Sequence, residues 1–391
     1  MFNQSELKIL VVDDEADLES LVRQKFRHQI REGIYDFVFA LNGVEALARI
    51  IEYPEIAIVL SDINMPEMDG LTLLTRLKEL KNTGLKTVIV SAYGDMDNIR
   101  EAMNRGAFDF ITKPIDFSDL EITIKKTLEE IQEVRRSLAE HYQLLSIQQD
   151  LNTAREIQQA ILPKDFPPFP DISSFDVFAS MVAAREVGGD FFDFFLMDKE
   201  RLGFVIGDVS GKGVPAAIFM AICRTLIRAS GVKGASAVNC ISAVNNLLCK
   251  ESVSSMFVTV FYGILDIGSG RVEYVNAGHN APYVISGEKI EPVELTGGLA
   301  LGIVENFEFK AKSLMLKPGD QMILFSDGVT EAFNANNQAF GNEKLEAILR
   351  NNVNSQLDAM VNEIIAEVNA FSYGVPQSDD LTLLAIRYKG P

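Results

Sequence analysis

Short apolar runs alternate with amphipathic helical patterns between residues 7 and 118, and this alternation constrains the fold more than any other feature of the chain. Runs without polar interruption, such as Ile56–Leu60, are expected of strands that helices cover on both faces. Strands alternating with helices predict a doubly wound α/β domain with a five-stranded parallel sheet. The expected strands are Lys8–Val12, Asp36–Ala40, Ile56–Ser61, Thr87–Ser91 and Asp109–Thr112. The expected helices are Ala16–Ile30, Gly43–Glu52, Leu71–Lys81 and Asp95–Arg105.

Polar residues stand where four of these strands end. They are Asp13, Asp14, Asp62, Ser91 and Lys113. Because the carboxyl ends of parallel strands meet at one rim, we expect these side chains to converge. Three carboxylates there would hold a hard divalent cation, for which Mg²⁺ is the obvious choice. One carboxylate could then attack phosphorus, while the ion and Lys113 offset the charge on the phosphoryl oxygens.

Residues 118 to 162 contain neither Gly nor Pro, which predicts one long helix that ends near Pro163. A heptad pattern runs along it, with one position at Ile124, Ile131, Leu138, Leu145 and Asn152. The second position, four residues later, holds Leu128, Arg135, Tyr142 and Gln149. Such a repeat favours a parallel dimeric coiled coil, and Asn152 could fix its register. A helix that lies along its own domain remains the alternative.

Residues 171 to 391 predict a second domain, in which strands come in neighbouring groups. This order favours a layered α+β sandwich. The expected strands are Phe175–Met181, Gly203–Gly207, Met256–Asp266, Arg271–Asn276, Met322–Ser326 and Leu381–Arg387. The expected helices are Pro215–Ser230, Ala235–Cys249 and Gln356–Phe371. The chain is therefore predicted to comprise domains at residues 1–120 and 164–391, joined by a helical linker at 121–163.

A second set of carboxylates lies in this domain, each beside a Gly or at a strand end. The set is Asp190, Asp208, Asp327, Asp379 and Asp380. Separated carboxylates suit two Mg²⁺ or Mn²⁺ ions, which can activate a water molecule towards a phosphoester. Because the chain has three His and three Cys, a His-based or thiol-based site is not expected. The Phe191–Phe195 run is interpreted as core.

The net charge and the hydropathy of the chain exclude some classes of function. A formal charge of −19 argues against nucleic-acid binding, which needs clustered Lys and Arg. No apolar run approaches the roughly 18 residues of a membrane span, and no basic leader precedes an apolar segment at the N-terminus. We therefore expect a cytoplasmic protein that does not bind membranes.

The rim residues lie in recognisable motifs. These are Val-Val-Asp13-Asp14, Ser61-Asp62-Ile-Asn-Met-Pro66-Glu-Met-Asp69-Gly70, Ser91-Ala92 and Lys113-Pro114. With them, residues 7 to about 120 resemble the receiver domain of bacterial response regulators. The resemblance implies that Asp62 accepts a phosphoryl group from a cognate histidine kinase, with Lys113 on the phosphate, Ser91 as switch hydroxyl and Phe110 as aromatic switch. The implied magnesium ligands are Asp13, Asp14, Asp62 and the carbonyl of Asn64. The peptide before Pro114 is expected to be cis.

The second domain also carries a set of motifs in order. They are Ala154-Arg-Glu-Ile-Gln-Gln-Ala-Ile-Leu-Pro163, the acidic motifs, Met256-Phe-Val-Thr259, Asn276-Ala-Gly-His279-Asn and Leu299-Ala-Leu-Gly302. Residues 150 to 388 therefore resemble the metal-dependent protein phosphatases (PPM), in the sporulation and stress-response branch of the SpoIIE/RsbU type. That family's fold is a β-sandwich flanked by helices. The implied metal ligands are Asp190, Asp208, the Val209 carbonyl, Asp327 and either Asp379 or Asp380, with Asp379 favoured.

Together the two resemblances imply a response regulator whose output is a serine/threonine phosphatase controlled through Asp62. The implied substrate is a phosphorylated anti-anti-sigma factor with a STAS domain, so that the enzyme would regulate a sigma factor. An alternative is an inactive phosphatase fold that acts by binding a partner, which the presence of all the metal carboxylates disfavours. A DNA-binding response regulator is a further alternative, disfavoured by the missing basic surface.

Overall fold

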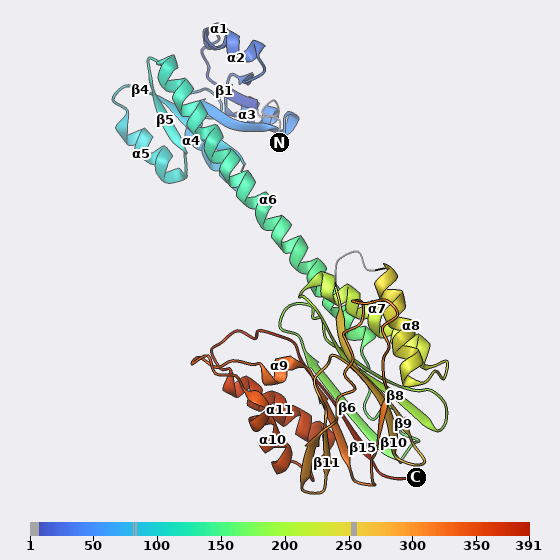
Figure 1. The fold of residues 1–391 in the computed structure, drawn as a ribbon. Coiled ribbons are helices and arrows are strands. Elements are labelled where there is room, and N and C mark those ends of the chain that lie inside the picture. Colours follow the sequence, from blue (N-terminus) through green and yellow to red (C-terminus); the bar gives the residue numbers. More distant parts are fainter. Residues whose placement is uncertain (1–7, 81, 83, 252–255) are drawn as a thin grey trace. The chain divides into compact units, whose positions relative to one another are not determined.

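The computed structural model describes residues 8–80, 82, 84–251 and 256–391. The chain divides into two compact units, one ending at Ser146 and the other beginning at Ile147. The division falls within helix α6 (Phe117–Ile161), which corresponds to the long helix predicted for residues 118 to 162 (Figure 1).

The first unit is a five-stranded parallel sheet with helices, as predicted. Its strands lie in the order β2-β1-β3-β4-β5, so the direction of winding changes between β1 and β3. The strands are β1 (Lys8–Val12), β2 (Asp36–Ala40), β3 (Ile56–Asp62), β4 (Lys86–Ala92) and β5 (Asp109–Lys113). The helices before α6 are α1 (Asp17–Lys25), α2 (Arg27–Arg31), α3 (Gly43–Glu52), α4 (Gly70–Glu79) and α5 (Met96–Arg105). The predicted helix end at Lys81 lies outside the described residues.

The single helix predicted for Ala16–Ile30 is wrong, because two helices occupy this segment. Phe26 separates helix α1 from α2, because its ψ of 18° leaves the helical range. The buried ring of Phe26 packs against the rings of Tyr35 and Phe37, at centroid distances of 5.7 and 5.4 Å. The helical pattern is therefore interrupted where an aromatic side chain turns into the core.

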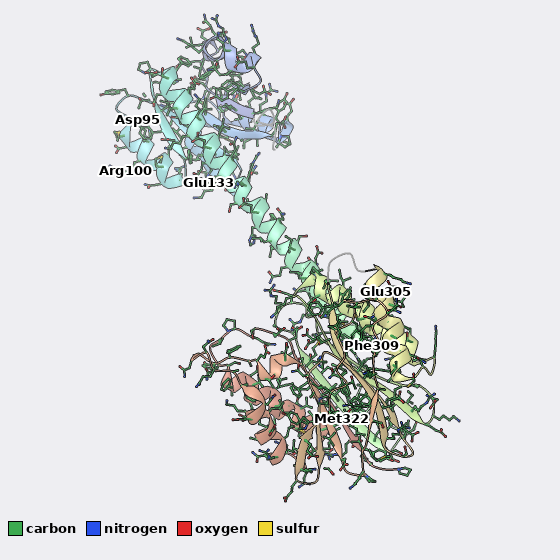
Figure 2. All side chains as sticks on the ribbon, in the orientation of Figure 1. Asp95, Arg100, Glu133, Glu305, Phe309 and Met322 are labelled. Atoms are coloured by element: carbon green, nitrogen blue, oxygen red, sulfur yellow. The ribbon has the colours of Figure 1, made fainter. Side chains whose placement is uncertain are left out.

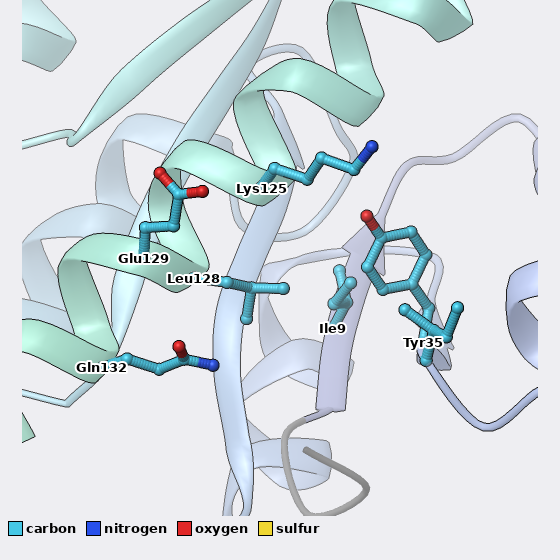
Figure 3. Close-up of a pocket in the computed structure, with 7 residues that line it drawn as sticks. Ile9, Tyr35, Lys125, Leu128, Glu129 and Gln132 are labelled. Carbon is cyan, nitrogen blue, oxygen red and sulfur yellow. The ribbon is translucent and has the colours of Figure 1, made fainter.

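Helix α6 begins as part of the first unit's core. Leu120, Ile124 and Ile131 are buried together with residues of the sheet. The adjoining helix surface borders a small pocket of about 180 Å³ (Figure 3). Residues lining it are Ile9, Tyr35, Lys125, Leu128, Glu129 and Gln132. The first two heptads predicted for an intermolecular seam are therefore used within the domain itself, which corrects that part of the prediction.

The second unit contains two antiparallel five-stranded sheets. Their strand orders are β13-β10-β9-β8-β7 and β12-β11-β14-β15-β6. The first sheet comprises β7 (Phe191–Leu196), β8 (Arg201–Val209), β9 (Val258–Asp266), β10 (Arg271–Ala277) and β13 (Lys312–Met315). The second comprises β6 (Phe175–Val182), β11 (Tyr283–Ser286), β12 (Lys289–Pro292), β14 (Gln321–Phe325) and β15 (Leu381–Tyr388).

Helices cover the outer faces of both sheets (Figure 1). They are α7 (Val214–Gly231), α8 (Ala237–Glu251), α9 (Asp327–Thr330), α10 (Gly341–Asn351) and α11 (Leu357–Phe371). Helices α7 and α8 pack on the first sheet, and α10 and α11 belong to the side of the second. Buried residues of both sheets, such as Phe204 and Met322, form the core between them. Met322 is labelled in Figure 2. The predicted sandwich flanked by helices is thus confirmed.

The short strands β11, β12 and β13 and the helix α10 were not predicted. Each of these strands has four residues, which is too short for an alternating pattern to stand out. The aromatic run Phe191–Phe195 does lie in the core, as predicted, and it forms strand β7. Its side chains are buried on both faces of the sheet, so the run shows no alternation either.

Helix α7 is long and apolar enough to cross a membrane by length and composition alone, and no other helix among the described residues is. Its apolar face packs inside the second unit. The buried residues are Ala216, Phe219, Met220, Cys223, Ile227 and Gly231. The composition of α7 is therefore that of a core helix.

Candidate functional site

The rim of the first sheet gathers the polar residues predicted to meet there. Asp13, Asp14 and Asp62 each bring a carboxylate oxygen to within 4.8 Å of the others. Among the described residues, no other group of three or more His, Cys, Asp or Glu side chains is as close. Asp13 and Asp62 are buried and Asp14 is exposed, so the group opens to solvent on one side. Hard oxygen donors in this arrangement fit Mg²⁺.

Lys113 lies among these carboxylates. Its Nζ is 2.6 Å from Asp62 Oδ2, 2.9 Å from Asp13 Oδ2 and 3.1 Å from Glu15 Oε1. Partial burial lowers the pKa of Lys113, but hydrogen bonds to these carboxylates outweigh burial and raise it above its ordinary value. Burial raises the pKa of Asp13, although Lys113 opposes the shift. The rim therefore carries a permanent cation directly beside Asp62.

The turn after Asp62 explains the glycine in its motif. A Cβ atom at Gly70 would overlap the carbonyl of Asp62, so no larger residue fits without moving the backbone. The Gly70 N–H donates to the Ile63 carbonyl at 2.9 Å, and the Asn64 N–H approaches Asp62 Oδ1 at 3.4 Å. The close packing of this turn thus holds Asp62 at the rim.

Two further predicted residues lie on the neighbouring strands. Ser91 is buried near the end of β4, and its hydroxyl has no hydrogen-bond partner among the described residues. Phe110 lies on β5 with its side chain 38% exposed. The peptide between Lys113 and Pro114 is cis, as predicted. The switching roles of Ser91 and Phe110 remain predictions.

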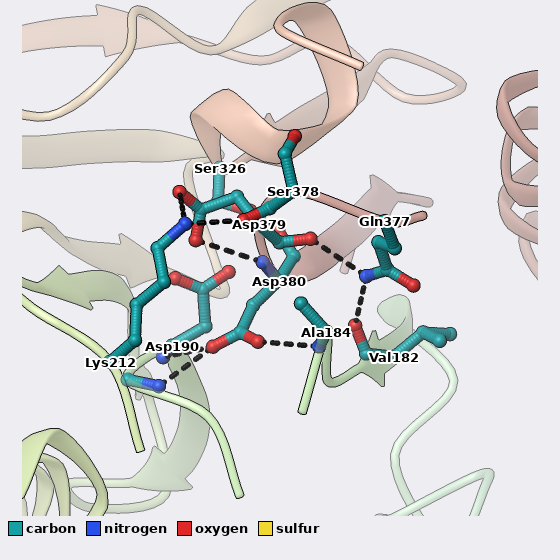
Figure 4. Close-up of polar contacts among 10 residues, drawn as sticks. Val182, Ala184, Asp190, Lys212, Ser326, Gln377, Ser378, Asp379 and Asp380 are labelled. Atoms are coloured by element: carbon teal, nitrogen blue, oxygen red, sulfur yellow. Dashed lines mark hydrogen bonds and ion pairs between the residues drawn. The ribbon is translucent and has the colours of Figure 1, made fainter. Parts of the chain in front are cut away.

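The second acidic set gathers at one edge of the sandwich. Figure 4 shows Asp190, Asp379 and Asp380 close together. Asp208 and Asp327 lie near enough to repel these carboxylates and each other. Asp190 immediately precedes β7 and Asp208 lies near the end of β8, so these two come from the first sheet. Asp327 begins α9 directly after β14, and the Asp379-Asp380 pair immediately precedes β15 in the second sheet. The two sheets therefore each contribute carboxylates to one site.

The neighbouring residues Asp379 and Asp380 have different surroundings. Both oxygens of Asp380 accept backbone N–H groups, from Ala184 at 2.8 Å and from Gly189 and Asp190 at 2.7 and 3.2 Å. Asp379 instead pairs through Oδ2 with Lys212 Nζ at 2.8 Å. Asp380 therefore holds the backbone before β7, and the choice of Asp379 as metal ligand stays a prediction.

The electrostatics of the set favour a bound cation. Burial and the neighbouring Asp208 and Asp380 carboxylates raise the pKa of Asp190 well above its ordinary value, and Asp190 Oδ2 is buried without a hydrogen-bond partner. Burial and Asp327 raise the pKa of Asp208 to about 7. Burial, Asp379 and Glu331 raise that of Asp327. Mutually repelling carboxylates with an unpartnered oxygen fit hard divalent ions.

Val209 follows Asp208 in the chain and lies close to the turn before Asp190; the role of its carbonyl as a metal ligand stays a prediction. Val209 ends β8, and a Cβ atom at Gly189 would be 2.9 Å from its carbonyl oxygen. The absence of a side chain at Gly189 therefore lets the turn before Asp190 approach this carbonyl closely.

The raised pKa values predict how stability depends on pH in protein stripped of metal. Asp190, Asp208 and Asp327 bind protons more tightly when folded than when unfolded, so stability should fall as pH rises from about 4 to about 7. Bound divalent ions would take the place of those protons, so Mn²⁺ should restore stability at pH 7.5 more than at pH 5. Urea denaturation followed by circular dichroism, with EDTA or Mn²⁺ at both pH values, measures this. A metal-free midpoint that rises with pH would contradict the prediction.

Comparison with known proteins matches both halves of the chain. The response regulator receiver domain family matches residues 9–125, and the family Stage II sporulation protein E (SpoIIE) matches residues 198–389. The chain combines a receiver domain with a SpoIIE-type domain. The receiver domain comes first. The SpoIIE-type domain has the fold of the SiaA-PP2C domain of Pseudomonas aeruginosa, with a TM-score of 0.56 at 21% identity over 63% of this chain and 98% of that one.

Individual relatives agree with this assignment. Protein IcfG of Synechocystis sp. is 32% identical over 267 residues, which cover 61% of this chain and 41% of that protein. Phosphoserine phosphatase RsbU of Bacillus subtilis is 29% identical over 258 residues, 64% of this chain and 74% of that protein. The crystal structure of the RsbU and RsbW domains of a Mycobacterium tuberculosis protein has a TM-score of 0.50 at 29% identity, covering 56% of this chain and 60% of that one. The chain thus spans less than half of IcfG.

Some residues of this SpoIIE-type site were not predicted from sequence. Lys212 reaches Asp379 and the Ser378 carbonyl from a loop whose flanking glycines both have positive φ. Gln158 on α6 contacts the turn that carries Asp190. The sequence did carry a signal for each: Lys212 lies between two glycines after a strand, and Gln158 lies in the helical motif of residues 154–163. Their contact partners, however, are distant in the sequence and could not be predicted.

Proposed function

We propose that this chain is a two-component response regulator whose output is metal-dependent dephosphorylation of phosphoserine or phosphothreonine in a protein. The observation that carries the proposal is the meeting of Asp190, Asp208, Asp327 and Asp379 at one edge of a SpoIIE-type sandwich. The raised pKa values of the first three mark a site that binding of divalent cations would stabilise.

The receiver residues would control this output. Asp62 would accept the phosphoryl group from a cognate histidine kinase, and Lys113, already 2.6 Å from it, would then pair with the phosphoryl oxygens. Ser91 and Phe110 would respond as the switch pair. The magnesium ligands would be Asp13, Asp14, Asp62 and the Asn64 carbonyl.

In the phosphatase domain, two Mn²⁺ or Mg²⁺ ions would supply Lewis-acid activation of water for attack on the phosphoester. The residues that would hold them are Asp190, Asp208, Asp327, Asp379 and the Val209 carbonyl. Asp380 would orient the turn before Asp190 through its three backbone N–H contacts. No side chain would act as a nucleophile, so no covalent enzyme intermediate would form.

The environments of the cysteines support water rather than a thiol as the nucleophile. Cys223 and Cys240 are buried in the core, and burial raises the pKa of Cys240 to about 12 and that of Cys223 further still. Burial also raises the pKa of Cys249. Thiolates are therefore disfavoured at all three positions.

The substrate would be a phosphorylated anti-anti-sigma protein with a STAS domain, encountered in the cytoplasm. Support comes from the SpoIIE family match and from RsbU, which is named a phosphoserine phosphatase. Release of phosphate from phosphoserine-bearing STAS proteins, assayed with Mn²⁺ and with EDTA, tests this. Mn²⁺-dependent release is expected, whereas no release from any phosphoserine protein under either receiver state would refute the enzyme assignment.

The chain would form a homodimer through the middle of α6. Leu138, Tyr142 and Leu145 are 42%, 69% and 49% exposed, and they occupy the two heptad positions. Neighbouring residues 135 to 150 are almost all exposed, so this stretch lies outside either core. A second copy of the helix would cover the apolar stripe, with the seam shortened to the part beyond Ile131.

Charges in that stripe should weaken the dimer. Leu138→Glu and Leu145→Glu would each place two like charges across the seam, and we expect the mass measured by light scattering to shift from dimer towards monomer. Leu144→Glu is the matched control, because Leu144 is 65% exposed but lies off the seam. A monomeric mass for the wild type at all concentrations would contradict the proposed seam.

A further inference from the structure

The end of helix α6 contacts the turn that carries Asp190. Gln158 is 6% exposed, and both atoms of its amide group bind the backbone of Gly188. Gln158 Nε2 donates to the Gly188 carbonyl at 2.6 Å, and the Gly188 N–H donates to Gln158 Oε1 at 3.0 Å. The adjacent Gln159 is exposed. The helical motif of residues 154–163 therefore includes one glutamine that faces the site and one that faces solvent.

Asp380 holds the same turn through its other N–H groups. The N–H groups of Gly189 and Asp190 donate to Asp380 Oδ2, so side chains bind three successive backbone N–H groups from residue 188 to residue 190. A Cβ atom at Gly188 would overlap Asp380 Oδ2, so the turn fits closely between its two partners. Asp190 leads directly from this turn into β7.

We infer that Gln158 is a positioning residue through which the last turns of α6 set the placement of Asp190, and with it the metal affinity of the phosphatase site. This inference rests on the proposed function and adds a point of regulation to the same site. A shift of α6 along or around its axis would pull on the Gly188 backbone through two hydrogen bonds at once. Because the contact is buried, water cannot readily replace it.

Gln158 would affect metal affinity indirectly, because it binds the backbone of the turn that carries the proposed ligand Asp190. Residues that orient a metal ligand through hydrogen bonds typically affect metal affinity by about 10-fold to 100-fold. Replacing Gln158 with alanine would leave the Gly188 N–H and carbonyl buried without these partners. We therefore expect weaker metal binding, with catalysis recovering once the metal is saturating.

The inference is tested by titrating the full chain with Mn²⁺ in a calorimeter. The binding sites that are lost in Asp208→Asn are taken as those of the phosphatase domain. Gln158→Ala should weaken these sites by about tenfold or more, while Gln159→Ala should match the wild type. Phosphate release by Gln158→Ala should require more Mn²⁺ for half-maximal rate yet approach the wild-type rate at saturation. Beryllofluoride at Asp62 should shift Mn²⁺ affinity in the wild type and shift it less in Gln158→Ala.

Equal Mn²⁺ affinity in Gln158→Ala and Gln159→Ala would overturn the inference. So would a rate in Gln158→Ala that stays low at saturating Mn²⁺, since that would indicate damage unrelated to metal placement. If Gln158→Ala does not fold, Gln158→Glu decides, because it keeps the size and the acceptor but sets an oxygen against the Gly188 carbonyl. Unchanged affinity in that variant would overturn the inference. Calorimetry measures Mn²⁺ binding and requires no catalysis. If the wild type fails to hydrolyse phosphoproteins, that result therefore refutes the proposed function but not the inference about Gln158.

Discussion

Asp208→Asn is expected to lower Mn²⁺-dependent phosphate release by about 1,000-fold. Burial, together with repulsion from the neighbouring Asp327 carboxylate, already raises the pKa of Asp208 to about 7. Replacing its carboxylate with an amide removes a negative charge that would hold the ions. Metal ions are worth several kcal/mol of transition-state stabilisation, and each 1.36 kcal/mol corresponds to a tenfold change in rate.

The variant should fold normally, because asparagine has the same size and removes repulsion from a crowded set of carboxylates. Asp198→Asn is the matched control. Asp198 is an exposed acid that pairs with Arg201 at the surface, so its replacement should leave the rate near that of the wild type. An Asp208→Asn enzyme with more than a tenth of the wild-type rate at saturating Mn²⁺ would contradict the assignment of Asp208.

The largest expected effect on stability comes from the ion pairs beneath α7. Asp193 on β7 is fully buried, with Oδ1 2.6 Å from Arg228 Nη1 and Oδ2 3.1 Å from Arg224 Nη2. Replacing both arginines with methionine would leave the Asp193 carboxylate buried and unpaired. Breaking a buried pair in this way typically costs about 3–5 kcal/mol. Urea denaturation followed by circular dichroism should show a correspondingly lower midpoint.

A triple variant separates the pairing from the packing. Adding Asp193→Leu to the two methionine replacements removes the buried charge, and apolar replacement of a whole buried ion pair is often neutral or stabilising. We expect most of the lost stability to return. If the triple variant is as unstable as the double variant, the loss arises from packing of the arginine stems rather than from the unpaired carboxylate.

The receiver site could be predicted from sequence because the strands of its sheet all run in the same direction. Parallel strands with buried faces are visible as apolar runs, and their carboxyl ends must share a rim, so Asp13, Asp62 and Lys113 had to converge. In the structure, Lys113 Nζ lies 2.9 Å from Asp13 Oδ2 and 2.6 Å from Asp62 Oδ2. The break at Phe26 could not be foreseen, because it depends on a ring finding partners in another part of the core.

The phosphatase site was predicted less completely. Its carboxylates come from two antiparallel sheets, and sequence spacing does not define how such sheets face each other. The ambiguity between Asp379 and Asp380 shows the limit, because the residues are adjacent and differ only in which distant groups they reach. The contact from Gln158 to Gly188 was hidden for the same reason. Similarly, the heptad pattern of α6 could not distinguish burial of Ile124 and Ile131 in the receiver from exposure of Leu138 and Leu145.

We propose that the state of Asp62 controls phosphate release at the second acidic site. The most direct measurement is the rate of Mn²⁺-dependent phosphate release from a phosphoserine STAS protein, with and without beryllofluoride, by the wild type and by Asp62→Ala. When two sites in a protein are coupled, the state of one typically changes the binding affinity of the other by about 5-fold to 150-fold. We expect beryllofluoride to change the rate of the wild type by at least about fivefold and to leave the rate of Asp62→Ala unchanged. Equal wild-type rates with and without beryllofluoride would contradict the proposal.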